Sequence, residues 1–264
     1  MKSVTKLLLF TIMVVPASLT SAQESPLNKN PENWDIKIGT YAMGKSLPWK
    51  GANTQTTILP GFNVSKGNWS FSLDTPIKYN FSLNPKIKGY MALDDRNDGY
   101  DSDQFTLTSL NQHSVFDGYE KPDDEVIVKL GFQFGIMKVE ANRDISGNSD
   151  AQQLSASFTY PLFRWQQTLM LSLTPTIQYS NAKYINYYYG VSAEQVNNGV
   201  GRKYYQGRSA NNYQLALNAK YKIDPSWKLM LKVGYTKFST SISDSPLVDS
   251  DHQQQASFIL AYSL

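Results

Sequence analysis

The sequence feature that most constrains the fold of this chain is a period-two alternation of apolar and polar residues. Residues 154–162 show it clearly, because Leu154, Phe158 and Leu162 fall on one face while Ser155 and Ser157 fall on the other. Alternation with this period indicates a β-strand whose two faces meet different environments. We therefore expect an all-β fold.

The same alternation returns in twelve segments of the chain. They are residues 34–38, 58–64, 69–73, 77–83, 87–93, 126–132, 137–141, 154–162, 169–179, 213–223, 227–235 and 258–264. Bacterial single-chain barrels have an even number of antiparallel strands, which brings both ends of the chain to the periplasmic side. The pattern therefore predicts a closed antiparallel transmembrane β-barrel with twelve strands.

The third and fourth segments decide the number of strands. Odd-numbered apolar residues run from Trp69 to Leu83 without a change of phase, and only Asp74, Thr75 and Pro76 indicate a turn between them. If that turn is absent, the two segments form one long strand, and a barrel of ten strands is the alternative.

The connectors alternate between tight and long, which distinguishes the two ends of the predicted barrel. The tight ones, expected on the periplasmic side, are residues 66–68, 84–85, 134–135, 164–165 and 224–226. The long ones, expected to face outward, are residues 44–55, 94–124, 144–153, 181–212 and 239–255.

A soluble β-sandwich would show the same alternation, but we expect its polar face to be rich in charge. Here that face holds mostly Ser, Thr, Gln, Asn and Gly, and the chain has 17 Tyr, a residue that favours membrane interfaces. The last segment resembles the final strand of exported barrels, although it ends on Leu264 where Phe is usual. These features favour the membrane barrel.

Residues 1–22 have the features of a secretory signal peptide. Lys2 and Lys6 precede an apolar run at residues 7–15, and small residues lead to a cleavage site after Ala22. No later segment reaches the roughly 18 apolar residues of a membrane-spanning helix. We therefore expect one domain, residues 23–264, in the outer membrane of a Gram-negative cell.

Composition narrows the functional classes further. The chain contains no cysteine, so disulfides and zinc-thiolate sites are excluded. Its net charge of +3 is too small, and its Lys and Arg too dispersed, to indicate nucleic acid as a partner. We expect no cofactor.

The two histidines do not form a catalytic pair in the sequence. A barrel lipase would need a His-x-Ser pair, but His113 directly precedes Ser114, so their side chains would point to opposite faces of a strand. A barrel protease would need Asp-x-His, but Asp251 directly precedes His252. We therefore predict no enzymatic activity and no catalytic residue.

The acidic run DDRNDGYDSD, residues 94–103, is the one candidate for a metal site. Aligned on Gly99 as a calcium loop, it places Arg96 at a ligand position and Phe105 where a bidentate Glu belongs. We predict no metal site and interpret the run as a solvated acidic loop, with loose divalent bridging to lipopolysaccharide as the alternative.

Three segments of the chain form a pattern: LPWKGAN at residues 47–53, YINYYYGVSAEQV at residues 184–196 and DSPLVDS at residues 244–250. The residues that carry it are Pro48, Trp49, Gly51, Tyr187, Tyr188, Tyr189, Gly190, Val191, Ser192, Ser245, Pro246, Leu247 and Val248. Together the three segments resemble the MipA/OmpV family of MltA-interacting outer-membrane proteins.

The resemblance implies a barrel that acts as a scaffold between a lytic transglycosylase and a peptidoglycan synthase in the periplasm. Other members of the family resemble osmoregulated surface proteins or adhesins. A small-solute channel is the alternative function, and a barrel lipase or protease is a third.

The long segment 181–212 has two further candidate roles. Its tyrosine run, Tyr187 to Tyr189, is either a sugar-stacking platform or, as we favour, part of the interfacial belt and of loop packing. Arg202, Lys203 and Arg208 are candidates for contact with lipopolysaccharide phosphates.

A last set of residues is a candidate docking surface for a periplasmic partner. These lysines lie beside the tight turns and alternate away from the lipid face; they are Lys86, Lys88, Lys138, Lys220, Lys222 and Lys228. They would make the inner mouth of the barrel electropositive, with Glu140 among the few acids nearby, and could steer an acidic protein or cell-wall polymer. The alternative is a solvated rim without a binding role.

Overall fold

The computed structural model describes residues 33–52, 54–100 and 113–264 of the chain. The expected signal peptide and the start of the barrel domain at residue 23 lie outside these residues, as do residues 101–103 of the acidic run and Phe105. No helix in the described part of the chain is long and apolar enough to cross a membrane.

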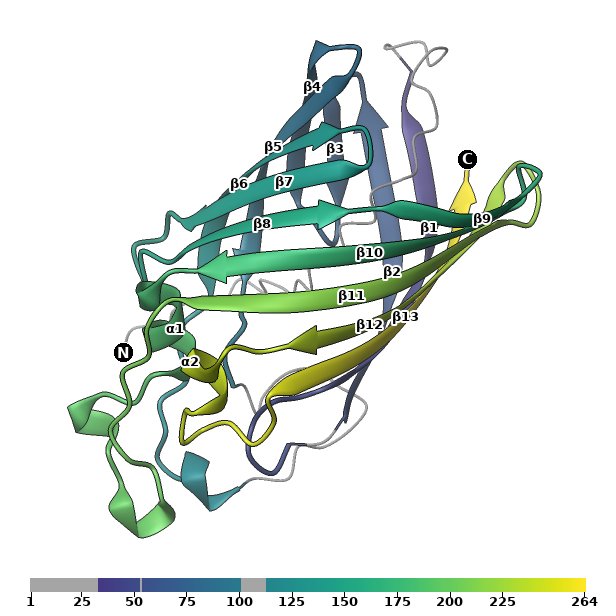
Figure 1. The fold of residues 1–264 in the computed structure, drawn as a ribbon. Helices are drawn as coiled ribbons and strands as arrows, with labels where there is room; N and C mark the ends of the chain where they lie inside the picture. The colour runs from purple at the N-terminus through teal and green to yellow at the C-terminus, as the bar shows by residue number, and fades with distance from the viewer. Residues whose placement is uncertain (1–32, 53, 101–112) are drawn as a thin grey trace, which may run out of the picture.

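One antiparallel sheet closes on itself to form a barrel (Figure 1). Its strands are β1 (Asp35–Ser46), β2 (Thr54–Lys66), β3 (Trp69–Ser72), β4 (Ile77–Asn84), β5 (Ile87–Arg96), β6 (Glu125–Phe134), β7 (Met137–Asp144), β8 (Gln152–Phe158), β9 (Tyr160–Trp165), β10 (Leu169–Ser180), β11 (Ala210–Lys222), β12 (Trp227–Lys237) and β13 (His252–Ser263). Closure comes from the pairing of β1 with β13. The all-β prediction is confirmed.

The wall of the barrel contains twelve strands, as predicted, because β8 and β9 are two parts of one strand. Both pair with β10, through Ser157 opposite Thr176 and Tyr160 opposite Leu173, and a shift of register follows within β9, opposite Leu171 and Ser172. Leu154 and Leu162 nevertheless point outward on the same face, with 49% and 57% of their surface exposed. The tight turn after β9 begins at Gln166, later than the predicted residues 164–165.

The turn between the third and fourth strands is present, so the ten-strand alternative is wrong. β3 pairs with β4 through Trp69 opposite Tyr79 and Ser70 opposite Lys78. The turn is closed by the Ser72 hydroxyl, which donates to Asp74 Oδ1 at 2.6 Å. Strand parity is therefore preserved by a very short strand.

The predicted difference between the two ends is confirmed. Tight turns gather at the end that also holds both ends of the sheet, which is the periplasmic end in bacterial barrels. The opposite end, here called the outer end, carries all the helices found in the described residues (Figure 1). These are η1 (Ser114–Phe116), α1 (Ala182–Tyr189), η2 (Ala193–Gln195), η3 (Asn198–Val200) and α2 (Thr240–Ser243).

The outer loops are shorter than the sequence pattern predicted, because the strands continue past the last apolar residue. β1 runs to Ser46 and β2 starts at Thr54, although the alternation predicted a loop at residues 44–55. Likewise β5 includes Asp94, Asp95 and Arg96. Near the outer rim the outward face no longer needs apolar side chains, so hydrogen bonding continues without the apolar signal.

Candidate functional site

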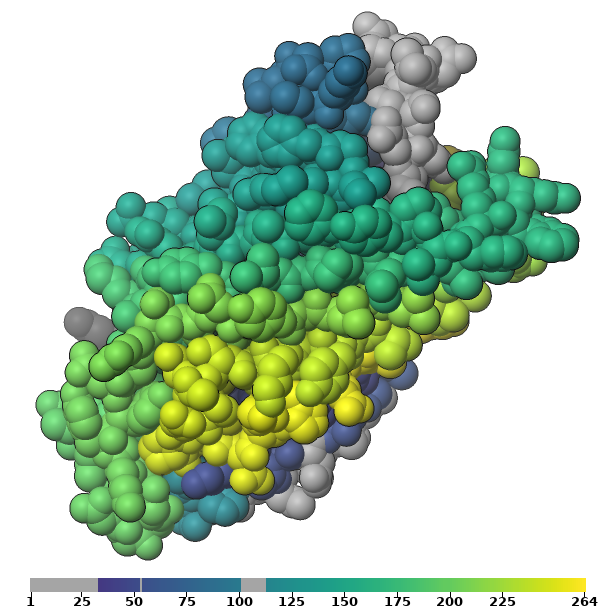
Figure 2. Space-filling view, in the orientation of Figure 1, coloured from purple at the N-terminus to yellow at the C-terminus, as the bar shows by residue number. Residues whose placement is uncertain are grey.

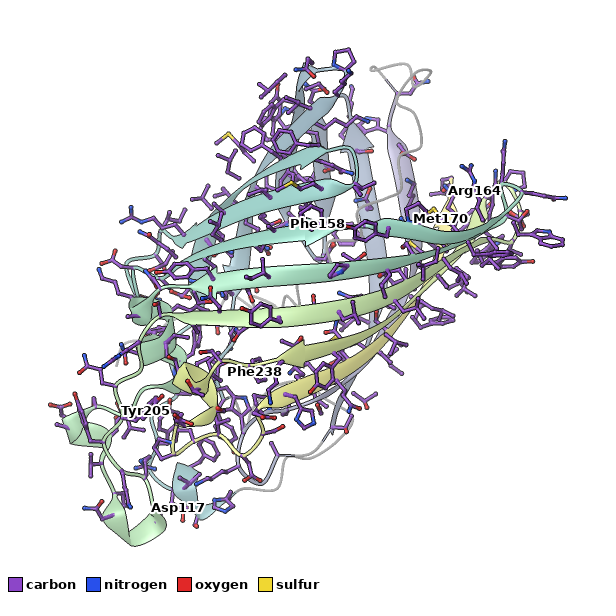
Figure 3. The ribbon with its side chains drawn as sticks, viewed as in Figure 1. Asp117, Phe158, Arg164, Met170, Tyr205 and Phe238 are labelled. Carbon is purple, nitrogen blue, oxygen red and sulfur yellow. The ribbon has the colours of Figure 1, made fainter. Side chains whose placement is uncertain are left out.

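The interior of the barrel is a polar cavity of about 460 Å³. Its lining runs from Trp49 and Tyr189 at the outer end to Gly135 and Met170 beside the periplasmic turns. Figure 3 shows Met170 and Arg164 at the periplasmic end and Tyr205 and Asp117 at the opposite end. The cavity therefore extends along the barrel towards the periplasmic mouth.

The outer end of this cavity is covered by packed loops. We call this hydrophobic cluster the outer cap; it consists of Leu47, Trp49, Tyr100, Val115, Phe116, Ala151, Tyr184, Ile185, Tyr188, Tyr189, Val191, Ala210, Ile242, Leu247 and Val248. Figure 2 shows the loop after α1, in green, beside the yellow C-terminal residues over the same end. Most of the large side chains that the fold buries belong to this cap.

The three segments of the family pattern meet in the outer cap. Trp49 stacks on Tyr189 with ring centroids 5.0 Å apart, and it forms a β-bridge with Val248. The Ser245 hydroxyl donates to the Tyr189 carbonyl oxygen at 2.7 Å. The Lys50 amide donates to the carbonyl oxygen of Leu247 at 2.9 Å. The pattern therefore marks residues that hold the loops to one another.

The remaining pattern residues also have structural roles in these loops. Gly51 has a φ of +66°, and a Cβ there would lie 2.8 Å from Cβ of His113. Val191 exchanges two backbone hydrogen bonds with Tyr205, at 2.9 and 3.1 Å. The Pro48 carbonyl oxygen accepts from the Asp249 amide at 2.8 Å. Pattern residues Gly190, Ser192 and Pro246 lie in the same loops.

Helix α1 brings the tyrosines to the cap. Asn181 caps its N-terminus by accepting a hydrogen bond from the Tyr184 amide at 2.9 Å, and Gly190 follows its last residue. Tyr188 and Tyr189 are 0% and 5% exposed, and Tyr187 donates from its rim position to the Asp123 carbonyl oxygen at 2.9 Å. The tyrosine run therefore packs the outer loops. Loop packing was one part of the role that we favoured for it from the sequence.

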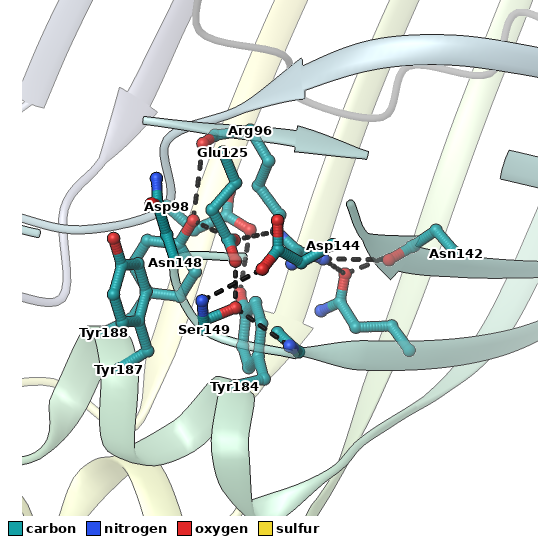
Figure 4. Close-up of polar contacts among 12 residues, drawn as sticks. Arg96, Asp98, Glu125, Asn142, Asp144, Asn148, Ser149, Tyr184, Tyr187 and Tyr188 are labelled. Atoms are coloured by element: carbon teal, nitrogen blue, oxygen red, sulfur yellow. Dashed lines mark hydrogen bonds and ion pairs between the residues drawn. The ribbon is translucent and has the colours of Figure 1, made fainter. Parts of the chain in front are cut away.

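A buried polar network attaches α1 to the barrel wall (Figure 4). The Tyr188 hydroxyl donates to Glu125 Oε2 at 2.5 Å, and Arg96 Nε donates to the same oxygen at 2.7 Å. Arg96 Nη1 reaches Asn142 Oδ1 at 2.8 Å and Gln153 Oε1 at 3.2 Å. The network joins β5, β6, β7 and β8 beneath the cap.

The tyrosines of α1 remain protonated donors in this setting. Burial raises the pKa of the Tyr188 phenol well above its ordinary value, and the nearby Asp98 and Glu125 raise it further. Burial, aided by Glu125 and Asp123, raises the pKa of Tyr187 to about 12. Both hydroxyls therefore serve as hydrogen-bond donors near neutral pH.

The first residues of the acidic run, Asp94 to Arg96, do not form the solvated loop that we predicted; they belong to β5. Asp94 is 3% exposed and forms an ion pair with Lys129 inside the barrel, and Arg96 pairs with Glu125. Among the described residues, no cluster of His, Asp and Glu could hold a metal ion. Sequence reasoning missed this network because it read Arg96 only as a failed calcium ligand.

Halfway along the barrel, a lysine on the wall formed by β5 to β7 is again paired with a carboxylate. Lys138 Nζ lies 2.8 Å from Glu140 Oε2, and Tyr90 donates to the same carboxylate oxygen. The ammonium groups of Lys78 and Lys138 lie 4.3 and 5.1 Å from the Tyr90 ring centroid. The charge of Lys138, a predicted rim residue, is therefore directed into the cavity and neutralised there.

The other predicted docking lysines lie at the periplasmic end. Lys86 is exposed in the turn after β4, and Lys88 follows it on β5. Lys222 lies directly opposite Lys228 across β11 and β12, and Lys220 lines the cavity two residues further inward. The structure thus brings Lys220, Lys222 and Lys228 together on two neighbouring strands.

The two histidines have structural contacts near the outer end, His113 in a loop and His252 as the first residue of β13. His113 Nδ1 accepts from the Val115 amide at 3.1 Å and caps η1. His252 Nδ1 lies 3.0 Å from Asp251 Oδ1 and 3.3 Å from the Ser250 hydroxyl. Both neighbours contact the same ring nitrogen, whereas a Ser-His-Asp triad uses both nitrogens.

Arg202 is not available to lipopolysaccharide, contrary to the sequence-based expectation. It is 3% exposed, and its guanidinium donates to the carbonyl oxygens of Gln195 and Val115, each at 2.6 Å. It therefore joins two outer loops. Lys203 and Arg208 are exposed, and contact of these two residues with lipopolysaccharide phosphates stays a prediction.

Comparison with known proteins gives a family match over most of the chain. The model described as MltA-interacting protein MipA matches residues 38–264. YiaT of Escherichia coli strain K12 is 25% identical over 250 residues, which cover 90% of this chain and 94% of that protein. The outer membrane protein OmpV of Vibrio cholerae serotype O1 is 31% identical over 86 residues, 33% of each chain.

Among solved structures, the NanC porin is similar with a TM-score of 0.37 and 10% sequence identity. That match covers 88% of this chain and all of the porin chain.

Proposed function

This chain belongs to the family of the MltA-interacting protein MipA, and from that membership we propose that it is a non-enzymatic scaffold with a periplasmic docking rim. Relatives are named as outer membrane proteins, and the chain is likewise an outer-membrane barrel. The proposed partners are a lytic transglycosylase and a peptidoglycan synthase in the periplasm. Lipid and lipopolysaccharide surround the barrel.

The proposal is supported most by the contrast in access between the two ends. The outer cap covers one end of the cavity, while the periplasmic end carries Lys86, Lys88, Lys220, Lys222 and Lys228. Between residues 210 and 237, which span β11, its turn and β12, Asp224 is the one acidic residue against five lysines, so this part of the rim has a net positive charge. A basic rim raises the association rate of an acidic partner.

Charge reversal tests the docking rim. In the triple variant Lys220→Glu, Lys222→Glu, Lys228→Glu, we expect capture of the purified transglycosylase MltA by the detergent-solubilised barrel to weaken at least about tenfold. The association rate of the unchanged protein should fall steeply as salt is added, because exposed charges are screened beyond about 8 Å at physiological ionic strength.

The matched control reverses three cations of the outer loops, Lys121, Lys203 and Arg208, to Glu. It changes the net charge equally but should leave capture unchanged. Equal capture by both triple variants would reject the docking rim and leave its lysines as a solvated surface. Both variants should keep the difference in gel migration before and after boiling that a closed barrel shows.

A small-solute channel is the second candidate function. It is favoured by one observation, the polar cavity of about 460 Å³ that runs along the barrel. Twelve strands enclose a narrower lumen than the 16 strands of porins with an aqueous channel. Solutes can pass only if the outer cap moves or leaves a gap, so a substitution of Trp49 in the cap should change conductance.

A further inference from the structure

Acidic residues are confined to one part of the barrel wall. Within the strands of the structure they lie on β1, β5, β6 and β7. β8 to β13 contain neither aspartate nor glutamate. The cavity face of this acid-free wall consists mainly of hydroxyl and amide side chains; they include Ser155, Thr174, Thr176, Gln178, Gln214 and Asn218.

Lys232 projects from the acid-free wall into the cavity without a counter-ion. It lies in the middle of β12, and the residues opposite it on the two neighbouring strands are Asn218 and Ser257. In the described part of the chain, no carboxylate lies within salt-bridge distance of its ammonium group. Lys129 and Lys138, on the other wall, both have such partners.

Arg96 offers a second cationic donor to the same cavity. Its side chain is only 4% exposed, and its Nη2 has no hydrogen-bond partner among the described residues. Leaving a buried donor without a hydrogen bond costs about 1–3 kcal/mol of folding stability, so a ligand that accepts from Nη2 would recover that cost. β5 and β12 are six strands apart in a twelve-stranded ring, so the two donors come from opposite walls.

We propose that the cavity binds a hydroxylated anion of monosaccharide size that enters from the periplasm. Lys232 and Arg96 Nη2 pair with the carboxylate or phosphate, and the hydroxyl and amide side chains of the acid-free wall bind the sugar hydroxyls. The volume of the cavity lies within the range of ligand sites, about 300–1,000 Å³. Of the docking-rim residues only Lys220 also lines the cavity, and the site, which lies deeper in the barrel, adds a ligand to the scaffold.

Sugars that share one ring but differ in charge test the proposal. We would measure binding to the full mature chain in neutral detergent by equilibrium dialysis, using glucuronate, glucose 6-phosphate, glucose and glucosamine. We expect one or both anions to bind at least about tenfold more tightly than glucose, and glucosamine to bind no better than glucose.

The variant Lys232→Gln removes the charge and keeps a polar side chain that is one atom shorter. It should weaken binding of the preferred anion about tenfold and leave glucose unchanged. The control Lys237→Gln removes a lysine from the same strand outside the cavity lining, where it is 49% exposed, and should bind the anion normally.

Three results would overturn the proposal. They are equal binding of the charged and neutral sugars, no binding of either anion by the folded protein, and anion binding that Lys232→Gln leaves unchanged. Heat-dependent gel migration of each variant shows whether its barrel is closed. The docking rim is read out separately by capture of MltA, so either proposal can fail alone.

Discussion

The two ends of this barrel are built by different physical means. The outer end has a hydrophobic core of its own, in which loops far apart in the sequence pack around Tyr188 and Trp49. The periplasmic end consists of tight turns whose large apolar residues, such as Ile136 at 48% and Trp165 at 62%, remain exposed. The difference teaches that the strands alone hold the wall, while a separate globular unit closes it.

Truncating the centre of the cap should give the largest effect. Tyr188→Ala removes a fully buried ring and its hydrogen bond to Glu125. Loss of a buried aromatic side chain costs about 3–5 kcal/mol. The free energy of local opening measured by hydrogen exchange in residues 181–191 should fall by about that amount. The strands should keep their protection, because their hydrogen bonds do not depend on the cap.

The matched substitution at the other end is Ile136→Ala, in the turn between β6 and β7. Its effect should stay within about 0.5 kcal/mol because the side chain is half exposed. If both variants exchange alike, the outer end has no cooperative core and the contrast between the ends is wrong.

Opening the cap should also change conductance. Trp49→Ala removes the ring that stacks on Tyr189 above the cavity, so single-channel events in planar bilayers should become more frequent and larger than in the unchanged protein. Trp34→Ala, at an exposed position on the periplasmic side, serves as the control and should not alter conductance. A large steady current through the unchanged protein would instead favour the channel function.

The smallest effect should come from an exposed ion pair at the edge of the cap. A hydrogen bond from Lys183, at 2.7 Å, holds the pKa of Asp150 below its ordinary value. Because the pKa of Asp150 is lower in the folded state, its ion pair with Lys183 stabilises the fold above the unfolded pKa of roughly 3.9. That stabilisation is lost as the pH falls through the folded pKa.

Hydrogen exchange of residues 145–151, corrected for the intrinsic effect of pH, should therefore show slight loosening on acidification below about pH 4. Asp150→Asn should remove that dependence. Persistence of the same pH response in this variant would assign it to another group.

The sequence predicted the wall better than the cap for a physical reason. Lipid on one side and a polar cavity on the other impose alternation on every strand, so residues such as Leu154 and Ser155 reveal their faces without tertiary information. Loop packing leaves no such period. The pattern residues Trp49, Tyr189 and Val248 were recognised, but nothing local indicates that they touch.

Charged side chains were the hardest to place from sequence. Arg96 was assigned to a solvated loop and Arg202 to the surface, yet both are buried because distant carboxylate and carbonyl oxygens accept their hydrogen bonds. The absence of a counter-ion beside Lys232 could have been inferred from the sequence, because the last five of the twelve predicted strands contain neither Asp nor Glu.

The seam between β1 and β13 has a consequence for how the molecule is made. It joins Lys37 opposite Ser263 through Lys45 opposite Gln255, and at Gly39 the Leu260 carbonyl leaves no room for a side chain. These partners are the most distant in the chain, so the seam is the step with the greatest loop-closure entropy. A polypeptide halted before His252 would retain the ladders from β1 to β12 and still present two open edges to hydrocarbon. The arrival of β13 is thus the event that separates a finished molecule from an unfinished one during biogenesis.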